Sequence, residues 1–183
     1  MANIKILKSS VQDKSEKLGT FFDQFQGGNY VVYGELFLFE YDGNEKDFNL
    51  QTLKDIYFDL PDKKDLDLNH SSSRYKYIDG KINTATWNEA YNQINHNLRY
   101  AAASEGWQPA EDTMLDIVTN EEHEKRKQIF WKIIRENFDL PPDYIFFHEA
   151  HYLSYFSFYV MWGFCYIFLN DGKGLVIHAG AGD

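Results

Sequence analysis

Two histidines are the first residues whose types and spacing could do chemistry. His148 and His151 enclose the sequence His148-Glu149-Ala150-His151, and imidazole nitrogens are frequent zinc ligands. Residues at i and i+3 converge on one ion when they lie on a helix, whereas odd spacing along a strand directs them to opposite faces. The apolar run before them is typical of a strand, and the spacing of an HExxH zinc motif is absent. We therefore expect two polar histidines at a strand end, with no metal ligands and no cofactor.

The one cysteine of the chain is the second candidate. Cys165 lies in a long apolar run, and His178 lies in the next one. If the two runs pair as a hairpin, their register sets Cys165 directly opposite His178. A thiol beside an imidazole is the arrangement that activates cysteine nucleophiles, but a cysteine inside an apolar strand is usually a small buried hydrophobe. Because the sequence names no third group to orient the pair, packing is the favoured interpretation and we expect no catalytic residue.

Acidic residues form the third pattern. Residues 40–67 carry nine acidic residues against four lysines, and residues 105–124 carry seven against no lysine or arginine. The formal charge of −10 opposes nucleic-acid binding, because that affinity comes largely from neutralising phosphates with lysine and arginine. Charge runs usually face solvent, and the alternative is a surface that steers and captures a basic protein. The residues expected to contact such a partner are Asp42, Glu45, Asp47, Asp59, Asp62, Asp65 and Asp67.

The stretch from Ser154 to Leu169 must position the thiol and the histidines, since no other part of the chain is apolar for so long. Aromatic and β-branched residues dominate it with a period of two, which predicts a strand. Asp171-Gly172 separates it from a second apolar run and predicts a two-residue type I′ turn. A strand of this length must bend to fit a compact chain, and we expect a bulge at Gly163. The expected cross-strand pairs are Phe168 with Leu175, Tyr166 with Ile177, Phe164 with Ala179, Ile167 with Val176, and Cys165 with His178.

Other patterns predict the elements around this hairpin. Apolar residues at helical spacing, alternating strand patterns and Gly or Pro punctuation mark them out. The expected elements are a helix over residues 11–25, a strand over 30–41 inside the sheet, a short helix over 50–60, a polar loop over 61–73, and a hairpin over 74–83 that turns at Asp79-Gly80.

Two capping boxes predict the longer helices. Thr86-x-x-Glu89 precedes a helix over 87–105, and Thr119-x-x-Glu122 precedes one over 120–138 that Pro141-Pro142 ends. Each helix carries one apolar stripe. The outward face of the second is expected to present a small basic cluster, consisting of Lys125, Arg126 and Lys127.

Tight hairpins join only antiparallel neighbours, so the expected architecture is α+β. We expect one domain over residues 1–183, with a mainly antiparallel sheet of about five strands and the helices at 87–105 and 120–138 on one face. If the other face is open, Tyr155, Tyr159 and Met161 would form an aromatic patch able to pair copies of the chain. The alternative is that helices cover both faces.

Composition and the N-terminal residues indicate in which cellular compartment the protein is expected. One cysteine excludes an intramolecular disulfide framework, which fits a reducing cytosol. The N-terminal residues lack the apolar core of a signal peptide, so we expect a cytoplasmic protein. The longest apolar run falls short of the ~20 residues that a membrane-spanning helix needs, and we expect no membrane association.

The C-terminal third resembles a known class of proteins. An aromatic strand with Trp162-x-Phe164, followed by Asp171-Gly172, a short strand and a terminal Asp183, in a compact acidic α+β chain, is similar to the small immunity proteins of bacterial polymorphic toxin systems. The resemblance implies a cytosolic protein that binds a cognate toxin domain and blocks its active site without catalysis of its own. It transfers no functional residue.

Three functions therefore remain in view from the sequence, one of them a structural subunit of a homo-oligomer that pairs through the open aromatic face. The leading hypothesis is an acidic protein-binding domain, an immunity protein whose partner is a basic toxin such as a nuclease. The alternative is a small enzyme or ligand-binding domain with a pocket between the sheet and the helices, where His148, His151, Cys165 or His178 would act.

Overall fold

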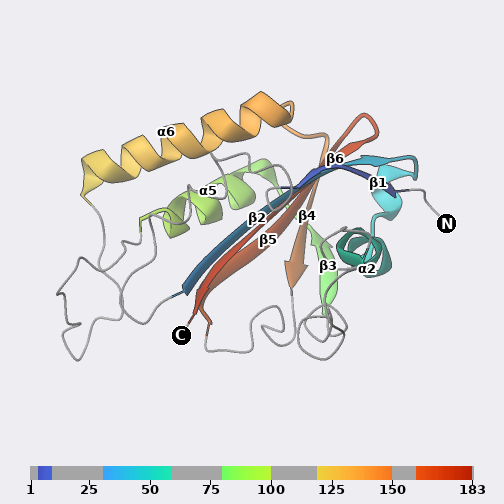
Figure 1. Cartoon of the computed structure of the whole chain (residues 1–183), viewed down its shortest axis with the longest axis horizontal. Helices are drawn as coiled ribbons and strands as arrows, with labels where there is room; N and C mark the ends of the chain where they lie inside the picture. Colours follow the sequence, from blue (N-terminus) through green and yellow to red (C-terminus); the bar gives the residue numbers. More distant parts are fainter. Residues whose placement is uncertain (1–3, 10–30, 59–79, 100–118, 150–159, 183) are drawn as a thin grey trace.

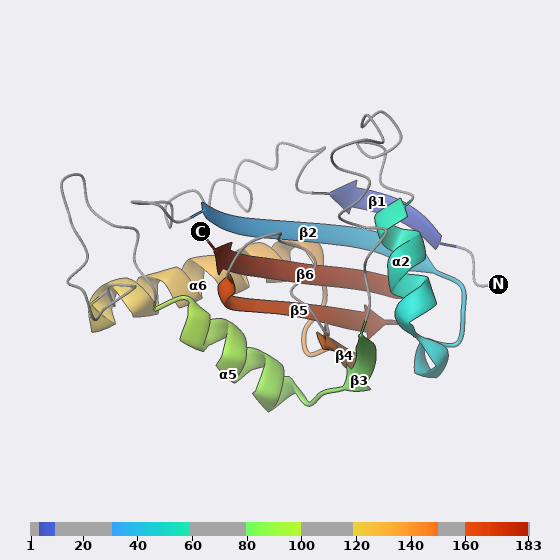
Figure 2. The same cartoon turned by 90° about the horizontal axis from the view of Figure 1, so that it is seen from below.

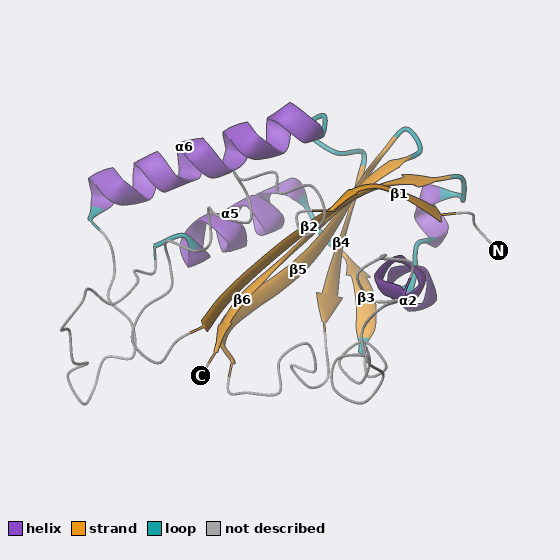
Figure 3. Cartoon of the chain, viewed as in Figure 1, coloured by secondary structure: helices purple, strands orange, loops and turns teal. Residues whose placement is uncertain are grey.

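The computed structural model describes residues 4–9, 31–58, 80–99, 119–149 and 160–182. These residues form an α+β fold, in which a six-stranded antiparallel sheet is flanked by helices (Figures 1 and 3). The strand order is β1-β2-β6-β5-β4-β3 (Figure 2). The strands are β1 (Ile4–Ser9), β2 (Val31–Tyr41), β3 (Lys81–Thr84), β4 (Tyr144–Glu149), β5 (Val160–Asn170) and β6 (Lys173–Gly182), and the helices are η1 (Glu45–Asp47), α2 (Leu50–Phe58), α5 (Trp87–Asn97) and α6 (Asn120–Asn137).

The hairpin of β5 and β6 lies inside the sheet, with the predicted register confirmed. Asp171 and Gly172 form its two-residue loop, and both have positive φ angles, 47° and 74°, as a type I′ turn requires. All five predicted pairs are present, among them Phe168 with Leu175 and Cys165 with His178. This register decides which side chains reach each face of the sheet.

The bulge predicted at Gly163 is wrong. Gly163 pairs regularly with Gly180, and the register shifts earlier, between Val160 and Trp162. A bulge of the common type needs no glycine, because its extra residue adopts right-handed helical backbone angles. The shift falls beside Gly182, the last residue of β6, where few further ladder bonds constrain the spacing.

Helices cover both faces of the described sheet (Figure 1). On one face, α5 and α6 pack on the side chains of β5 and β6, and the shared buried cluster includes Ile94, Phe130, Ile134, Phe168 and Ile177. On the other face, α2 and the segment before it contribute to a second cluster that includes Phe48, Leu53, Ile56, Ile167 and Val176. The predicted packing of the two long helices on one face is confirmed, and α2 adds cover on the opposite face.

Helix starts follow the predicted caps, with one difference. At α5 the capping box is complete, since Thr86 Oγ1 accepts from the Glu89 amide and the Glu89 carboxylate accepts from the Thr86 amide. The bonds that the Glu89 carboxylate accepts from the Thr86 amide and the Thr86 hydroxyl hold its pKa below the ordinary value. At α6 Thr119 Oγ1 accepts from the Glu122 amide at 3.2 Å, while the Glu122 carboxylate accepts from Nε of Arg126 at 3.0 Å.

The predicted outward position of Arg126 is therefore wrong. Its exposed fraction is 6%, because it lies four residues before Phe130 and three after His123 on the buried stripe of α6. Lys125 is exposed, and Lys127 pairs with Glu124.

Several predicted elements lie outside the described residues. They are the helix over 11–25, the loop over 61–73 and the first arm of the hairpin over 74–83. The predicted end of the helix over 87–105 is wrong: α5 ends at Asn97, and the amide of its C-cap, Leu98, donates to the Ile94 carbonyl at 3.2 Å. The second arm of that hairpin is β3, which pairs with β4. Tyr155 and Tyr159, which were predicted to form an open aromatic face, also lie outside the described residues. Among the described side chains, Ile129 is the one large apolar group that is exposed. Within the described ranges, no helix has both the length and the apolar character needed to cross a bilayer.

Gly174 offers a test of the packing at the turn end of the sheet. It pairs with Phe39, and a Cβ atom at this position would enter the Phe39 ring, which is fully buried. We expect Gly174→Ala to lower the free energy of unfolding by roughly 2 kcal/mol, because an overpacked core must shift to accept the added methyl. Urea unfolding measures the change. The neighbouring exposed change Lys173→Ala is the control, expected within about 0.5 kcal/mol of the wild type, and equal stability of Gly174→Ala and the wild type would contradict the packing described here.

Candidate functional site

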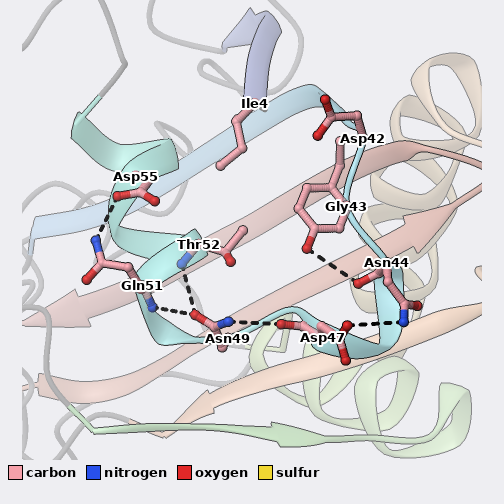
Figure 4. Close-up of a pocket in the computed structure, with 10 residues that line it drawn as sticks. Ile4, Asp42, Gly43, Asn44, Asp47, Asn49, Gln51, Thr52 and Asp55 are labelled. Atoms are coloured by element: carbon pink, nitrogen blue, oxygen red, sulfur yellow. Dashed lines mark hydrogen bonds between the residues drawn. The ribbon is translucent and has the colours of Figure 1, made fainter. Parts of the chain in front are cut away.

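An acidic depression lies where the end of β2 meets α2. Its volume is about 530 Å³. Three carboxylates line it, and Figure 4 shows them spaced around the rim. The side chains on which the site depends are Ile4, Tyr41, Asp42, Asp47, Thr52 and Asp55.

Asparagine side chains shape the backbone around this depression. Asn49 Oδ1 accepts from the amides of Gln51 at 2.9 Å and Thr52 at 3.2 Å, as the N-cap of α2. Asn44 Oδ1 accepts from the Lys46 amide at 3.2 Å and so starts η1. These caps satisfy backbone donors that the short helices leave unpaired, and they hold Thr52 and its helix against the rim (Figure 4).

Hydrogen bonds also fix two of the carboxylates. Asp47 accepts from Nδ2 of Asn44 at 3.1 Å, and Asp55 accepts from Nε2 of Gln51 at 2.7 Å (Figure 4). Both donors are neutral amides, so these bonds orient the carboxylates without placing a positive charge beside them. Two of the three acidic groups that line the depression are therefore held in place.

Tyr41 lies beneath the rim and reports the electric field there. Its exposed fraction is 4%, its ring packs edge-on against Phe48 at 5.9 Å between centroids, and its hydroxyl donates to the Asn44 carbonyl at 3.4 Å. Burial raises the pKa of Tyr41, the nearby charges of Asp47, Asp42 and Glu45 raise it further, and a hydrogen bond with Thr52 opposes them. A phenol whose ionised form is disfavoured by three carboxylates marks a region of negative potential.

The structure places three of the seven acidic residues predicted to contact a partner. Asp42 and Asp47 line the depression. Glu45 instead turns toward the hairpin, where its carboxylate accepts from the Gly172 amide at 2.9 Å. The remaining four lie outside the described residues: Asp59, Asp62, Asp65 and Asp67.

Sequence reasoning did not select Tyr41, Thr52 or Asp55 for this site. The spacing of Thr52 and Asp55, three residues apart on a helix, was an available signal that they share a face. Only the fold shows that this face turns toward the end of β2. Glu40, which belongs to the same acidic segment, pairs with Lys5 of β1 at 3.3 Å instead.

The predicted thiol and imidazole groups lie elsewhere, on the α2 face of the sheet. Cys165 and His178 are opposite each other on β5 and β6, and both are buried. His148 is also buried, in β4, whereas His151 lies outside the described residues. In the part of the chain that the structure describes, no three His, Cys, Asp or Glu side chains are grouped closely enough to hold a metal ion.

Titration of Tyr41 tests the field of the depression. We expect Asp42→Asn and Asp47→Asn each to lower the pKa of Tyr41, because each removes a charge that disfavours the phenolate. Carbon-13 NMR of tyrosine-labelled protein measures it. Since the pKa of Tyr41 is raised in the folded state, the stability that this group contributes is present below its unfolded pKa and is lost as the pH rises through the folded one.

Tyr166 is the internal control for this titration. Burial raises its pKa to about 12, with Glu89 as the second cause. Neither Asp42 nor Asp47 contributes to that shift, so the pKa of Tyr166 should stay constant in both variants. A Tyr41 pKa that does not respond, or a Tyr166 pKa that falls equally, would contradict the field described here.

Comparison with known proteins assigns no family. No protein-family model matches the chain, and no curated protein matches it. Among solved structures, the crystal structure of citrus MAF1 aligns over 89% of this chain and 95% of its own, at 13% sequence identity and a TM-score of 0.44. At that TM-score the likeness supports no inference about function.

Proposed function

We propose that this protein is an acidic protein-binding domain that captures a basic partner through the depression beside α2. The single observation that carries the proposal is the placement of Asp42, Asp47 and Asp55 around one concavity. A concave surface with one sign of charge raises the local concentration of oppositely charged groups and speeds their association. Lysine or arginine side chains of a partner would enter the depression and pair with these carboxylates.

The net charge of the chain supports the same partner. The formal charge is −10, so a basic protein is attracted from a distance and an acidic one is repelled. The resemblance of the C-terminal third to polymorphic-toxin immunity proteins implies the class of the partner, a basic toxin domain such as a nuclease. The protein would act in the cytoplasm by covering the toxin's active site, with no catalysis of its own.

A second candidate function rests on the size of the depression. Its volume of about 530 Å³ falls in the range of roughly 300–1,000 Å³ that small-molecule sites occupy. The carboxylates would then select a small organic cation. Calorimetric titration with a polyamine separates the two candidates, since stoichiometric binding that Asp55→Asn weakens would favour a ligand-binding domain.

Binding to a basic toxin domain encoded beside this chain tests the leading proposal. We expect salt-sensitive binding, because the attraction between exposed charges is screened by ions. The triple variant Asp42→Asn, Asp47→Asn and Asp55→Asn should bind roughly tenfold more weakly, mostly through slower association. Surface plasmon resonance at low and high salt gives both rates.

A charge-matched variant distinguishes the depression from net charge. Glu121→Gln, Glu136→Gln and Asp139→Asn also remove three negative charges, at exposed positions in or just after α6, on the other face of the sheet. We expect this control to retain most of the affinity. Equal weakening of both variants would assign the attraction to overall charge, and no binding of the toxin domain by the wild type would reject the proposal.

A further inference from the structure

Aspartate followed by glycine is a reactive pair in proteins, and three such pairs occur in this chain. They are Asp42-Gly43, Asp79-Gly80 and Asp171-Gly172. Glycine has no Cβ atom, so its nitrogen can approach the carboxyl group of the preceding side chain closely. The structure describes both residues of the first and the last pair, whereas Asp79 lies outside the described residues. The two described pairs share one chemistry and differ in their contacts.

The pair Asp171-Gly172 is held by its neighbours. The Gly172 amide donates to the Glu45 carboxylate at 2.9 Å, and the Gly172 carbonyl accepts from the Tyr41 amide at 2.8 Å. A hydrogen bond to a carboxylate is roughly twice as strong as one between neutral groups. The Gly172 nitrogen must give up this bond before it can turn toward the carboxyl group of Asp171, so the reaction requires the hairpin turn to open.

The pair Asp42-Gly43 has no equivalent bond. It lies between the end of β2 and the start of η1, with Asp42 exposed and Gly43 half-buried (Figure 4). Among the described residues, none accepts a hydrogen bond from the Gly43 amide. The nitrogen of Gly43 is therefore available to the neighbouring carboxyl group while the protein stays folded.

We propose that Asp42 is a site of spontaneous isoaspartate formation, and that the bond to Glu45 prevents the same reaction at Asp171. In the step, the Gly43 nitrogen attacks the carboxyl carbon of the Asp42 side chain in its acid form. The new C–N bond closes a five-membered imide as a C–O bond breaks, and the hydroxyl group leaves with the amide proton as water. A second water molecule opens the ring at the main-chain carbonyl, so the chain then runs through the side-chain carbon.

This modification changes the rim of the acidic depression. A methylene group enters the main chain between β2 and η1, and the carboxylate of Asp42 is left directly on the α-carbon. Weaker capture of a basic partner by aged protein is a consequence that rests on the proposed function. The modification itself does not, and it is measured without any partner.

Ageing of the whole folded chain at neutral pH tests the proposal. Isoaspartate has the mass of aspartate but fragments differently under electron transfer, so mass spectrometry of the digested protein follows each site separately. We expect isoaspartate to accumulate at Asp42 at least about tenfold faster than at Asp171, a factor that corresponds to about 1.4 kcal/mol. In urea the two rates should become similar, because both pairs then lie in an unfolded chain. Equal rates in the folded protein, or no isoaspartate at Asp42, would overturn the proposal.

Substitutions test the role of each neighbour. Gly43→Ala should slow the reaction at Asp42 several-fold, because the added methyl group hinders the attacking nitrogen; the φ angle of Gly43 is not positive, so alanine is tolerated there. Glu45→Ala should raise the rate at Asp171, whereas Glu40→Ala, which removes an exposed carboxylate of β2, should leave it unchanged. A wild-type rate at Asp171 in folded Glu45→Ala protein, or an equal rise in both variants, would overturn the role given to Glu45.

Discussion

The register of the β5–β6 hairpin is the constraint on which the rest of the structure depends. A slip of one residue in β5 would send Phe164 and Phe168 to the α2 face and bring Cys165 beneath α5 and α6. The two-residue loop prevents this slip, since its positive φ angles are available to Gly172 and tolerated by Asp171. The hairpin also fixes its neighbour, because the Gly172 carbonyl accepts from the Tyr41 amide at 2.8 Å.

The turn at Asp171-Gly172 also connects the hairpin to the acidic depression. Glu45 accepts a hydrogen bond from the Gly172 amide, so the loop after β2 is tied to the turn of the hairpin. Asp42 and Asp47 flank Glu45 in sequence and are held close to it. The hydrogen bond at Glu45 therefore fixes the loop from which Asp42 and Asp47 reach the depression.

The sequence predicted those parts of the fold that short-range signals determine. Asp171-Gly172 and the Thr86 capping box act within a few residues, so the hairpin register and the start of α5 follow from local chemistry. Strand β1 was missed because it is a short edge strand whose lysines interrupt the apolar pattern. Arg126 was predicted on the wrong face because the burial of a charged residue depends on tertiary contacts, which the local pattern does not show. The site was found in part, since charge density indicated Asp42 but only folding brings Asp55 to it.

Successive rows on the α2 face lead from the centre of the sheet to the acidic depression. The pair of Cys165 and His178 is followed by the row at Val176, then by the row of Phe39, Gly174 and Leu169, and finally by Tyr41 beside Gly172. The opposite face contributes a continuous apolar cluster to α5 and α6. One face therefore supports the long helices, whereas the other combines an open acidic end with a buried polar end. Because apolar rows separate these ends, neutralising the carboxylates of the depression should leave the packing around the buried histidines unchanged.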